Sequence, residues 1–167
     1  MNNIYLIGMP GCGKSTLGKA ISEKLNMTFT DTDEMIVQKA GMPISEIFGK
    51  YGEEHFRDIE TECIKEISKE ENFVIATGGG LPLRQENRDV MNATGIVIFI
   101  DVDLEMLIKR SAFGGRPLLE GDGVKKLTAL YNARYEIYKN TASVIYKSGE
   151  DLSENIENVL KIIDKQN

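Results

Sequence analysis

The sequence has few of the residues that build metal centres, disulfides or histidine-dependent active sites. Its 167 residues include one histidine, two cysteines and no tryptophan. Cys12 and Cys63 belong to no CxxC pair and no cluster of histidine and cysteine, which argues against structural zinc and a disulfide framework. Nothing else suggests a hydrolase that uses His55, so we expect this residue on the solvated face of a helix.

Long apolar runs and an excess of positive charge are also missing. The longest apolar runs, 4–7 and 96–100, are far shorter than the roughly 20 residues of a membrane-spanning helix. The N-terminal residues 1–3 carry no basic side chain, unlike a signal peptide. A net charge of −6 argues against broad capture of nucleic acid. We therefore expect a cytoplasmic monomer that binds neither membranes nor nucleic acid.

Short apolar segments alternate along the chain with residues at helical spacing. The apolar segments predict strands at 4–7, 28–30, 73–76, 96–100 and 143–146. Among the helices, a short one is expected after Pro43 and a longer one from Phe56 to Ile67. Strands that alternate with helices predict a single α/β domain over 1–167, with a parallel sheet covered on both faces.

The segment Gly8–Thr16 fits the phosphate-loop pattern G-x-x-x-x-G-K-[ST], and it lies between an apolar strand and a helix as that motif requires. Glycines let backbone N–H groups turn toward phosphate oxygens at the positive end of the helix. Lys14 is expected to reach the β- and γ-phosphates, and the Ser15 hydroxyl to ligate Mg²⁺. The predicted ATP-binding set is Gly11, Cys12, Gly13, Lys14, Ser15 and Thr16, with Cys12 as a spacer rather than a nucleophile.

A phosphate loop is common to several classes of protein. The guanine-reading N-K-x-D tetrad is absent, which argues against a GTPase, and the chain is short for a helicase or a transporter ATPase. A compact phosphotransferase remains, and its acceptor site is expected beyond the carboxyl ends of the strands.

Two aspartates follow the second predicted strand. One carboxylate, from Asp33 or Asp31, could take a proton from an alcohol or hold it in line with the γ-phosphate, and the other could hold a water on Mg²⁺. The alternative is that an aspartate here only caps a helix. Gly78–Gly80 ends the next strand, and its lack of side chains would let a ligand touch the backbone, unless it is a plain turn.

Two arginines, Arg57 and Arg134, are candidates to bind a carboxylate. A guanidinium can donate two parallel hydrogen bonds to a carboxylate, a geometry that lysine lacks. The alternatives are a surface ion pair of Arg57 with Glu60 and a solvated Arg134. Arg116 lies in a glycine-flanked loop that predicts a mobile lid over about 111–123, from which a cation could cover the triphosphate.

Taken together, these motifs resemble the shikimate kinase family in order and spacing over about 4–146. The segments that carry the resemblance are Gly8–Thr16, Asp31-Thr32-Asp33, Phe56-Arg57-Asp58-Ile59-Glu60, Thr77-Gly78-Gly79-Gly80, Arg116-Pro117-Leu118-Leu119, and Arg134 with Tyr138. The resemblance implies transfer of the ATP γ-phosphate to the 3-hydroxyl of shikimate. It also implies the P-loop NTPase fold of nucleoside monophosphate kinases, with a five-stranded parallel sheet.

The resemblance also implies a role for each matched residue. Asp33 holds the reacting hydroxyl and acts as its base, while Asp31 acts on Mg²⁺ through water beside Ser15. The remaining roles are carboxylate binding by Arg57 and Arg134, contact with the ring hydroxyls by the Gly79 backbone, cover of ATP by Arg116, and contact with the adenine by Arg110. The rival readings are a kinase of another polyol acid such as gluconate, a nucleoside monophosphate kinase, and a nucleotide-binding module without catalysis.

Overall fold

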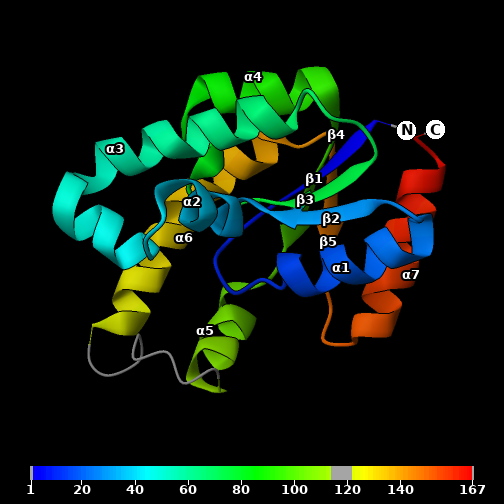
Figure 1. Cartoon of the computed structure of the whole chain (residues 1–167). Helices are drawn as coiled ribbons and strands as arrows, with labels where there is room; N and C mark the ends of the chain where they lie inside the picture. Colours follow the sequence, from blue (N-terminus) through cyan, green and yellow to red (C-terminus); the bar gives the residue numbers. More distant parts are fainter. Residues whose placement is uncertain (1, 114–121, 167) are drawn as a thin grey trace.

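The structure, a computed structural model, describes residues 2–113 and 122–166. Its centre is a five-stranded, all-parallel sheet with the strand order β2-β3-β1-β4-β5 (Figure 1). The strands are β1 (Asn3–Ile7), β2 (Thr28–Asp31), β3 (Phe73–Ala76), β4 (Gly95–Asp101) and β5 (Val144–Lys147). β1 pairs with β3 on one side and β4 on the other, and helices cover both faces of the sheet, so all of its residues are buried, which explains its continuous apolar run.

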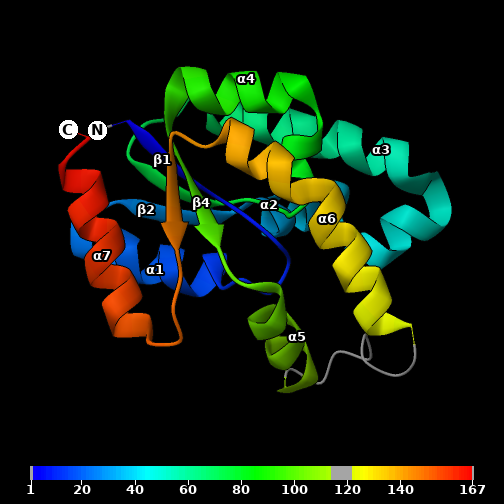
Figure 2. The ribbon, with the colours of Figure 1, turned by 180° about the vertical axis from the view of Figure 1, so that it is seen from behind.

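Helices cover both faces of this sheet (Figures 1 and 2). α1 and α7 pack together on one face, while α4 and α6 contact β4 and α3 packs on α4. The predicted sheet with helices on both faces is therefore confirmed. The helices are α1 (Lys14–Leu25), α2 (Thr32–Ala40), α3 (Ile44–Ile67), the short 3₁₀ helix η1 (Leu81–Leu83), α4 (Gln85–Thr94), α5 (Leu104–Phe113), α6 (Gly123–Thr141) and α7 (Leu152–Asp164).

The helices differ from the sequence-based expectation in two ways. The short helix after Pro43 and the longer helix that follows form one element, α3, which is broken at Gly52 by non-helical angles (φ 81°, ψ 176°). α2 and α4 were not predicted from the apolar pattern. Their buried residues are few and partly polar, namely Thr32 and Ile36 in α2 and Asn87 and Met91 in α4, so neither shows a clear apolar stripe.

The topology brings three segments of the sequence to one edge of the sheet. β2, β3 and β1 are parallel neighbours, so the segments that leave their carboxyl ends emerge side by side. These segments are the phosphate loop, the Asp31–Asp33 stretch and the glycine run that begins at Gly78. Arg116 and most of the predicted lid lie outside the described residues. Among the described helices, none is long and apolar enough to cross a membrane.

Candidate active site

The phosphate loop joins β1 to α1. Gly11 (φ 81°) and Gly13 (φ 97°) adopt left-handed backbone angles that other residues rarely take, which explains the second fixed glycine of the motif and the additional glycine at position 11. α1 begins at Lys14, whose Nζ donates to the carbonyl oxygens of Gly8 (3.0 Å) and Met9 (2.9 Å). The loop therefore already holds a buried cation beside its backbone, at the positive end of a helix.

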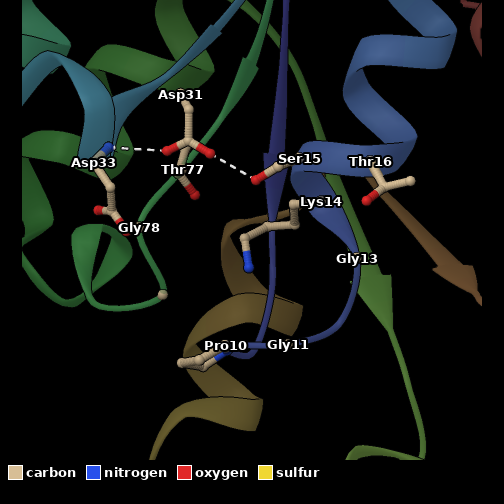
Figure 3. Close-up of a pocket in the computed structure, with 11 residues that line it drawn as sticks. Pro10, Gly11, Gly13, Lys14, Ser15, Thr16, Asp31, Asp33, Thr77 and Gly78 are labelled. Carbon is tan, nitrogen blue, oxygen red and sulfur yellow. Dashed lines mark hydrogen bonds between the residues drawn. The ribbon is translucent and has the colours of Figure 1, made fainter. Parts of the chain in front are cut away.

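A pocket of about 320 Å³ opens between this loop and the ends of β2 and β3. Figure 3 shows the Lys14 amino group pointing into the space between the Asp33 carboxylate and the loop. Residues from all three segments form its wall: Pro10, Gly11, Gly13, Lys14, Ser15, Thr16, Asp31, Asp33, Thr77, Gly78 and Gly79. Most of the phosphate loop thus shares one cavity with Asp31, Asp33 and Gly79, whereas Arg57 and Arg134 are not among its lining residues.

Asp31 links the phosphate loop to α2 (Figure 3). Its Oδ2 accepts a 2.6 Å hydrogen bond from Ser15 Oγ, and its Oδ1 accepts from the backbone N–H of Asp33 at 3.0 Å. Asp31 is therefore the N-cap of α2 and also a member of the pocket, so the capping and functional interpretations hold together. A hydroxyl and a carboxylate at contact distance are hard oxygen ligands of the kind that Mg²⁺ prefers.

Asp33 lies in the first turn of α2 and faces the pocket. Burial raises the pKa of its carboxyl above the ordinary range, and the nearby Asp31 carboxylate raises it further. The positive charges of Lys14 and Arg57 oppose this shift without cancelling it. A carboxylate with a raised pKa is a better proton acceptor than an ordinary aspartate.

Arg57 forms the ion pair with Glu60 that its spacing indicated, but this pair is largely buried rather than at the surface. Its Nη1 donates to Glu60 Oε2 at 2.5 Å, and its Nη2 donates to Glu53 Oε1 at 3.2 Å. The Glu60 side chain is only 1% exposed, and burial raises the pKa of its carboxyl while the Arg57 charge lowers it. Glu60 thus holds the Arg57 guanidinium in place. The i,i+3 spacing indicated the pair, but no pattern of neighbouring residues indicated its burial.

The glycine run after β3 touches the other acceptor candidates. A Cβ atom on Gly78 would lie 2.7 Å from Asp33 Oδ1, and one on Gly80 would lie 2.1 Å from Arg57 Nη1. A Cβ atom on Gly79 would lie 3.4 Å from Arg134 Nη1 on α6. Side chains at positions 78 and 80 would displace the Asp33 carboxylate and the Arg57 guanidinium, and one at position 79 would collide with the Pro10 ring at 2.9 Å, so the run needs glycine where these groups approach it.

Arg110 lies on the other side of the phosphate loop. Its Nη1 donates to the Cys12 carbonyl at 3.1 Å and its Nη2 to the Gly149 carbonyl at 3.3 Å. It lines a second pocket of about 230 Å³ together with Cys12, Gly13 and Thr16. The Cys12 side chain itself is buried, in agreement with its prediction as a spacer.

A comparison with protein-family models decides the family. The model described as shikimate kinase matches residues 10–164, which include the pocket residues described above. The chain belongs to the shikimate kinase family.

Individual shikimate kinases agree with this result over nearly the whole chain. A shikimate kinase of Clostridium botulinum (strain Eklund 17B / Type B) is 44% identical over 162 residues, which cover 97% of each chain. A solved shikimate kinase of Acinetobacter baumannii, in complex with shikimate, has a TM-score of 0.91 at 32% identity and covers 99% of this chain and 94% of its own. That of Aquifex aeolicus has a TM-score of 0.84 at 35% identity, covering 98% and 97%. The predicted P-loop kinase fold is therefore confirmed.

Within this shikimate kinase fold, the structure brings together most of the residues that the sequence singled out. Asp33, Arg57 and Arg134 converge on the glycine run, and Lys14 and Ser15 line the adjoining pocket. Arg116 lies outside the described residues. His55 is exposed and packs against Tyr51 with ring centroids 4.9 Å apart and the rings tilted, and it does not line this pocket.

Proposed function

We propose that this chain transfers the γ-phosphate of ATP to the 3-hydroxyl of shikimate, yielding shikimate 3-phosphate and ADP for chorismate and aromatic amino acid synthesis. The observation that carries the proposal is the convergence of Asp33, Arg57 and Arg134 on Gly78–Gly80, beside the phosphate loop. The two guanidinium groups can bind the carboxylate of an acceptor, the Asp33 carboxylate can accept the proton of its hydroxyl, and the glycine run lets the acceptor approach the backbone closely.

On the nucleotide side, the phosphate loop holds the phosphates of ATP. Lys14 moves its donors from the loop carbonyls to the β- and γ-phosphates, where its charge offsets the charge that develops during transfer. Ser15 and, through water, Asp31 would hold Mg²⁺, which neutralises phosphate charge when bound. Arg110 lies at the second pocket, on the adenine side of the loop, and Arg116 covers the triphosphate.

On the acceptor side, Arg57 and Arg134 bind the carboxylate and orient the ring, while the Gly79 backbone contacts the ring hydroxyls. Asp33 then faces the reacting hydroxyl and removes its proton, or holds its oxygen in line with the γ-phosphate. In phosphoryl transfer such positioning and charge stabilisation account for most of the catalysis. We further propose that the chain acts as a single-domain cytoplasmic monomer with a lid over about 111–123.

An assay of acceptor choice tests this function against its rivals. ATP, Mg²⁺ and the enzyme are incubated in turn with shikimate, gluconate, AMP and CMP, and ADP release is coupled to a spectrophotometric signal. Of the four acceptors, we expect only shikimate to be turned over. Phosphorus NMR should show that the product is phosphorylated on the 3-oxygen. Turnover with gluconate or a nucleotide and none with shikimate would overturn the proposal, as would ATP binding without turnover on any acceptor.

The raised pKa of Asp33 predicts a pH dependence. Only the ionised carboxylate accepts a proton, so kcat/KM for shikimate should fall as the pH drops through the raised pKa. Because the Asp31 charge is one cause of the shift, Asp31→Asn should move this acidic limb to lower pH, whatever its effect on the maximal rate. Rates between about pH 4 and 8 measure the limb. A limb at the same pH in both proteins would contradict this assignment.

The contact of Gly80 with Arg57 predicts a selective loss of acceptor binding. Gly80 has ordinary helical angles (φ −94°, ψ −11°), so alanine fits the backbone, but its Cβ would push the Arg57 guanidinium aside. We expect Gly80→Ala to raise the Kd of shikimate about tenfold or more, the usual scale for a lost hydrogen bond between charged groups. Calorimetry should show an unchanged Kd for ATP.

Gly49→Ala is the matched control for this variant. Gly49 lies in α3, and a Cβ there would meet no atom within 4 Å. We expect its shikimate affinity to equal that of the unmodified enzyme. If Gly80→Ala also bound shikimate normally, Arg57 would not be an acceptor contact.

A further inference from the structure

Tyr138 joins α6 to the glycine run that follows β3. Its side chain is completely buried, and its hydroxyl donates a 2.6 Å hydrogen bond to the carbonyl oxygen of Gly79. The ring is held from the sheet side by Phe99, with ring centroids 5.3 Å apart. A buried side chain of α6 is therefore hydrogen-bonded to the backbone of the proposed acceptor site.

This hydrogen bond sets the direction of backbone groups at the site. The Gly79 carbonyl belongs to the peptide that it shares with Gly80, and in a trans peptide the N–H points opposite to the carbonyl. The preceding peptide is held separately, because the Gly78 carbonyl accepts from the N–H of Leu81 at 3.0 Å. In the part of the chain that the structure describes, the N–H groups of Gly79 and Gly80 have no protein acceptor. Gly79 is partly exposed and lines the pocket, so its N–H remains available to a ligand, whereas Gly80 is buried.

Tyr138 also lies beside Arg134, one helical turn earlier on α6. Burial raises the pKa of Tyr138 to about 12, although the charge and hydrogen bonding of Arg134 lower it. The hydroxyl therefore stays protonated at neutral pH and remains a donor to Gly79. One side chain thus contacts two of the groups that face the acceptor, and these groups come from different elements of the fold.

We propose that Tyr138 is a positioning residue for the acceptor: its hydroxyl holds the Gly79–Gly80 peptide at a fixed place relative to Arg134, so that the backbone and the guanidinium meet the same ligand. This inference rests on the proposed shikimate site, because the groups that Tyr138 orients are those assigned to acceptor binding there. The competing explanation is that Tyr138 only fills the core. In that case its ring would matter to stability, and its hydroxyl would not matter to acceptor binding.

Tyr138→Phe tests the hydroxyl while keeping the ring, and Tyr135→Phe is the matched control. Tyr135 lies on the same helix, packs on the same Phe99 ring with centroids 5.6 Å apart, and donates to Asp101 Oδ2 at 3.2 Å instead of to the glycine run. Both variants lose one tyrosine hydrogen bond, so a general loss of stability should appear in both. Only the first should alter the acceptor site.

We expect Tyr138→Phe to raise the Kd and the KM for shikimate about three- to tenfold, the range for a lost neutral hydrogen bond, with an unchanged Kd for ATP. Tyr135→Phe should leave the Kd for shikimate within twofold. In ligand-free protein labelled with ¹⁵N-glycine, the Gly79 and Gly80 amide signals should shift in Tyr138→Phe and stay in place in Tyr135→Phe.

Two results would overturn this role: a shikimate Kd in Tyr138→Phe that stays within twofold of the unmodified enzyme, or an equal rise in both variants. Unshifted glycine signals would overturn it as well. The glycine signals need no substrate, so they test the hydrogen bond even if the unmodified enzyme proved inactive on shikimate. That inactivity would count against the proposed function alone.

Discussion

Asp33→Asn is expected to lower kcat about a thousandfold while ATP and shikimate still bind, the usual scale for removing a general base. Asparagine keeps the shape of the side chain but cannot accept the hydroxyl proton. Its amide NH₂, a hydrogen-bond donor, also replaces one of the two acceptor oxygens of the carboxylate. Arg57 and Arg134 are untouched, so the carboxylate of shikimate keeps its partners. Rapid-quench measurement of the chemical step, with Kd values from calorimetry, separates the two effects.

Asp89→Asn is the control for Asp33→Asn. Asp89 is an exposed carboxylate on α4 that accepts from Gln85 Nε2, away from the pocket, and its loss should leave kcat unchanged. If Asp33→Asn kept its kcat and lost only affinity for shikimate, Asp33 would be a binding residue and Asp31 the next candidate for the base. If both Asp33→Asn and Asp31→Asn were fully active, the acceptor would bind elsewhere.

Lys14→Ala is expected to lower kcat by on the order of a thousandfold or more, because no other described cation is placed inside the phosphate loop. Its ammonium donates to the Gly8 and Met9 carbonyls and would be replaced by a methyl group without a donor. Steady-state rates at saturating ATP and shikimate measure the loss, and circular dichroism checks that the fold is retained.

Lys19→Ala, on the same helix, is the control for Lys14→Ala. Lys19 is exposed, and its Nζ lies 5.5 Å from the centre of the Phe29 ring, outside the pocket. We expect its kcat to stay within twofold of that of the unmodified enzyme. Near-normal turnover in Lys14→Ala would refute the assignment of the phosphate loop.

Local patterns predicted the strands and the phosphate loop because each of these features depends on the types of residues that are adjacent in the sequence. The run 4–7 is continuously apolar because β1 is the central strand of a parallel sheet that is covered on both faces. Gly11 and Gly13 are required by their own positive φ angles, which residues with a side chain rarely adopt. The helices α2 and α4 could not be predicted in this way, because tertiary contacts rather than an apolar stripe stabilise them.

The sequence by itself determined the kind of protein, since a phosphate loop between a strand and a helix, followed by an aspartate pair and a glycine run, needs no knowledge of distant contacts. Only the tertiary structure decided which charged groups act together. The burial of Glu60 beside Arg57 depends on how α3 packs, and the bond from Tyr138 to Gly79 joins residues 59 positions apart. Burial and long-range hydrogen bonds depend on where the chain places its elements in space, and a pattern of neighbouring residues does not contain that information.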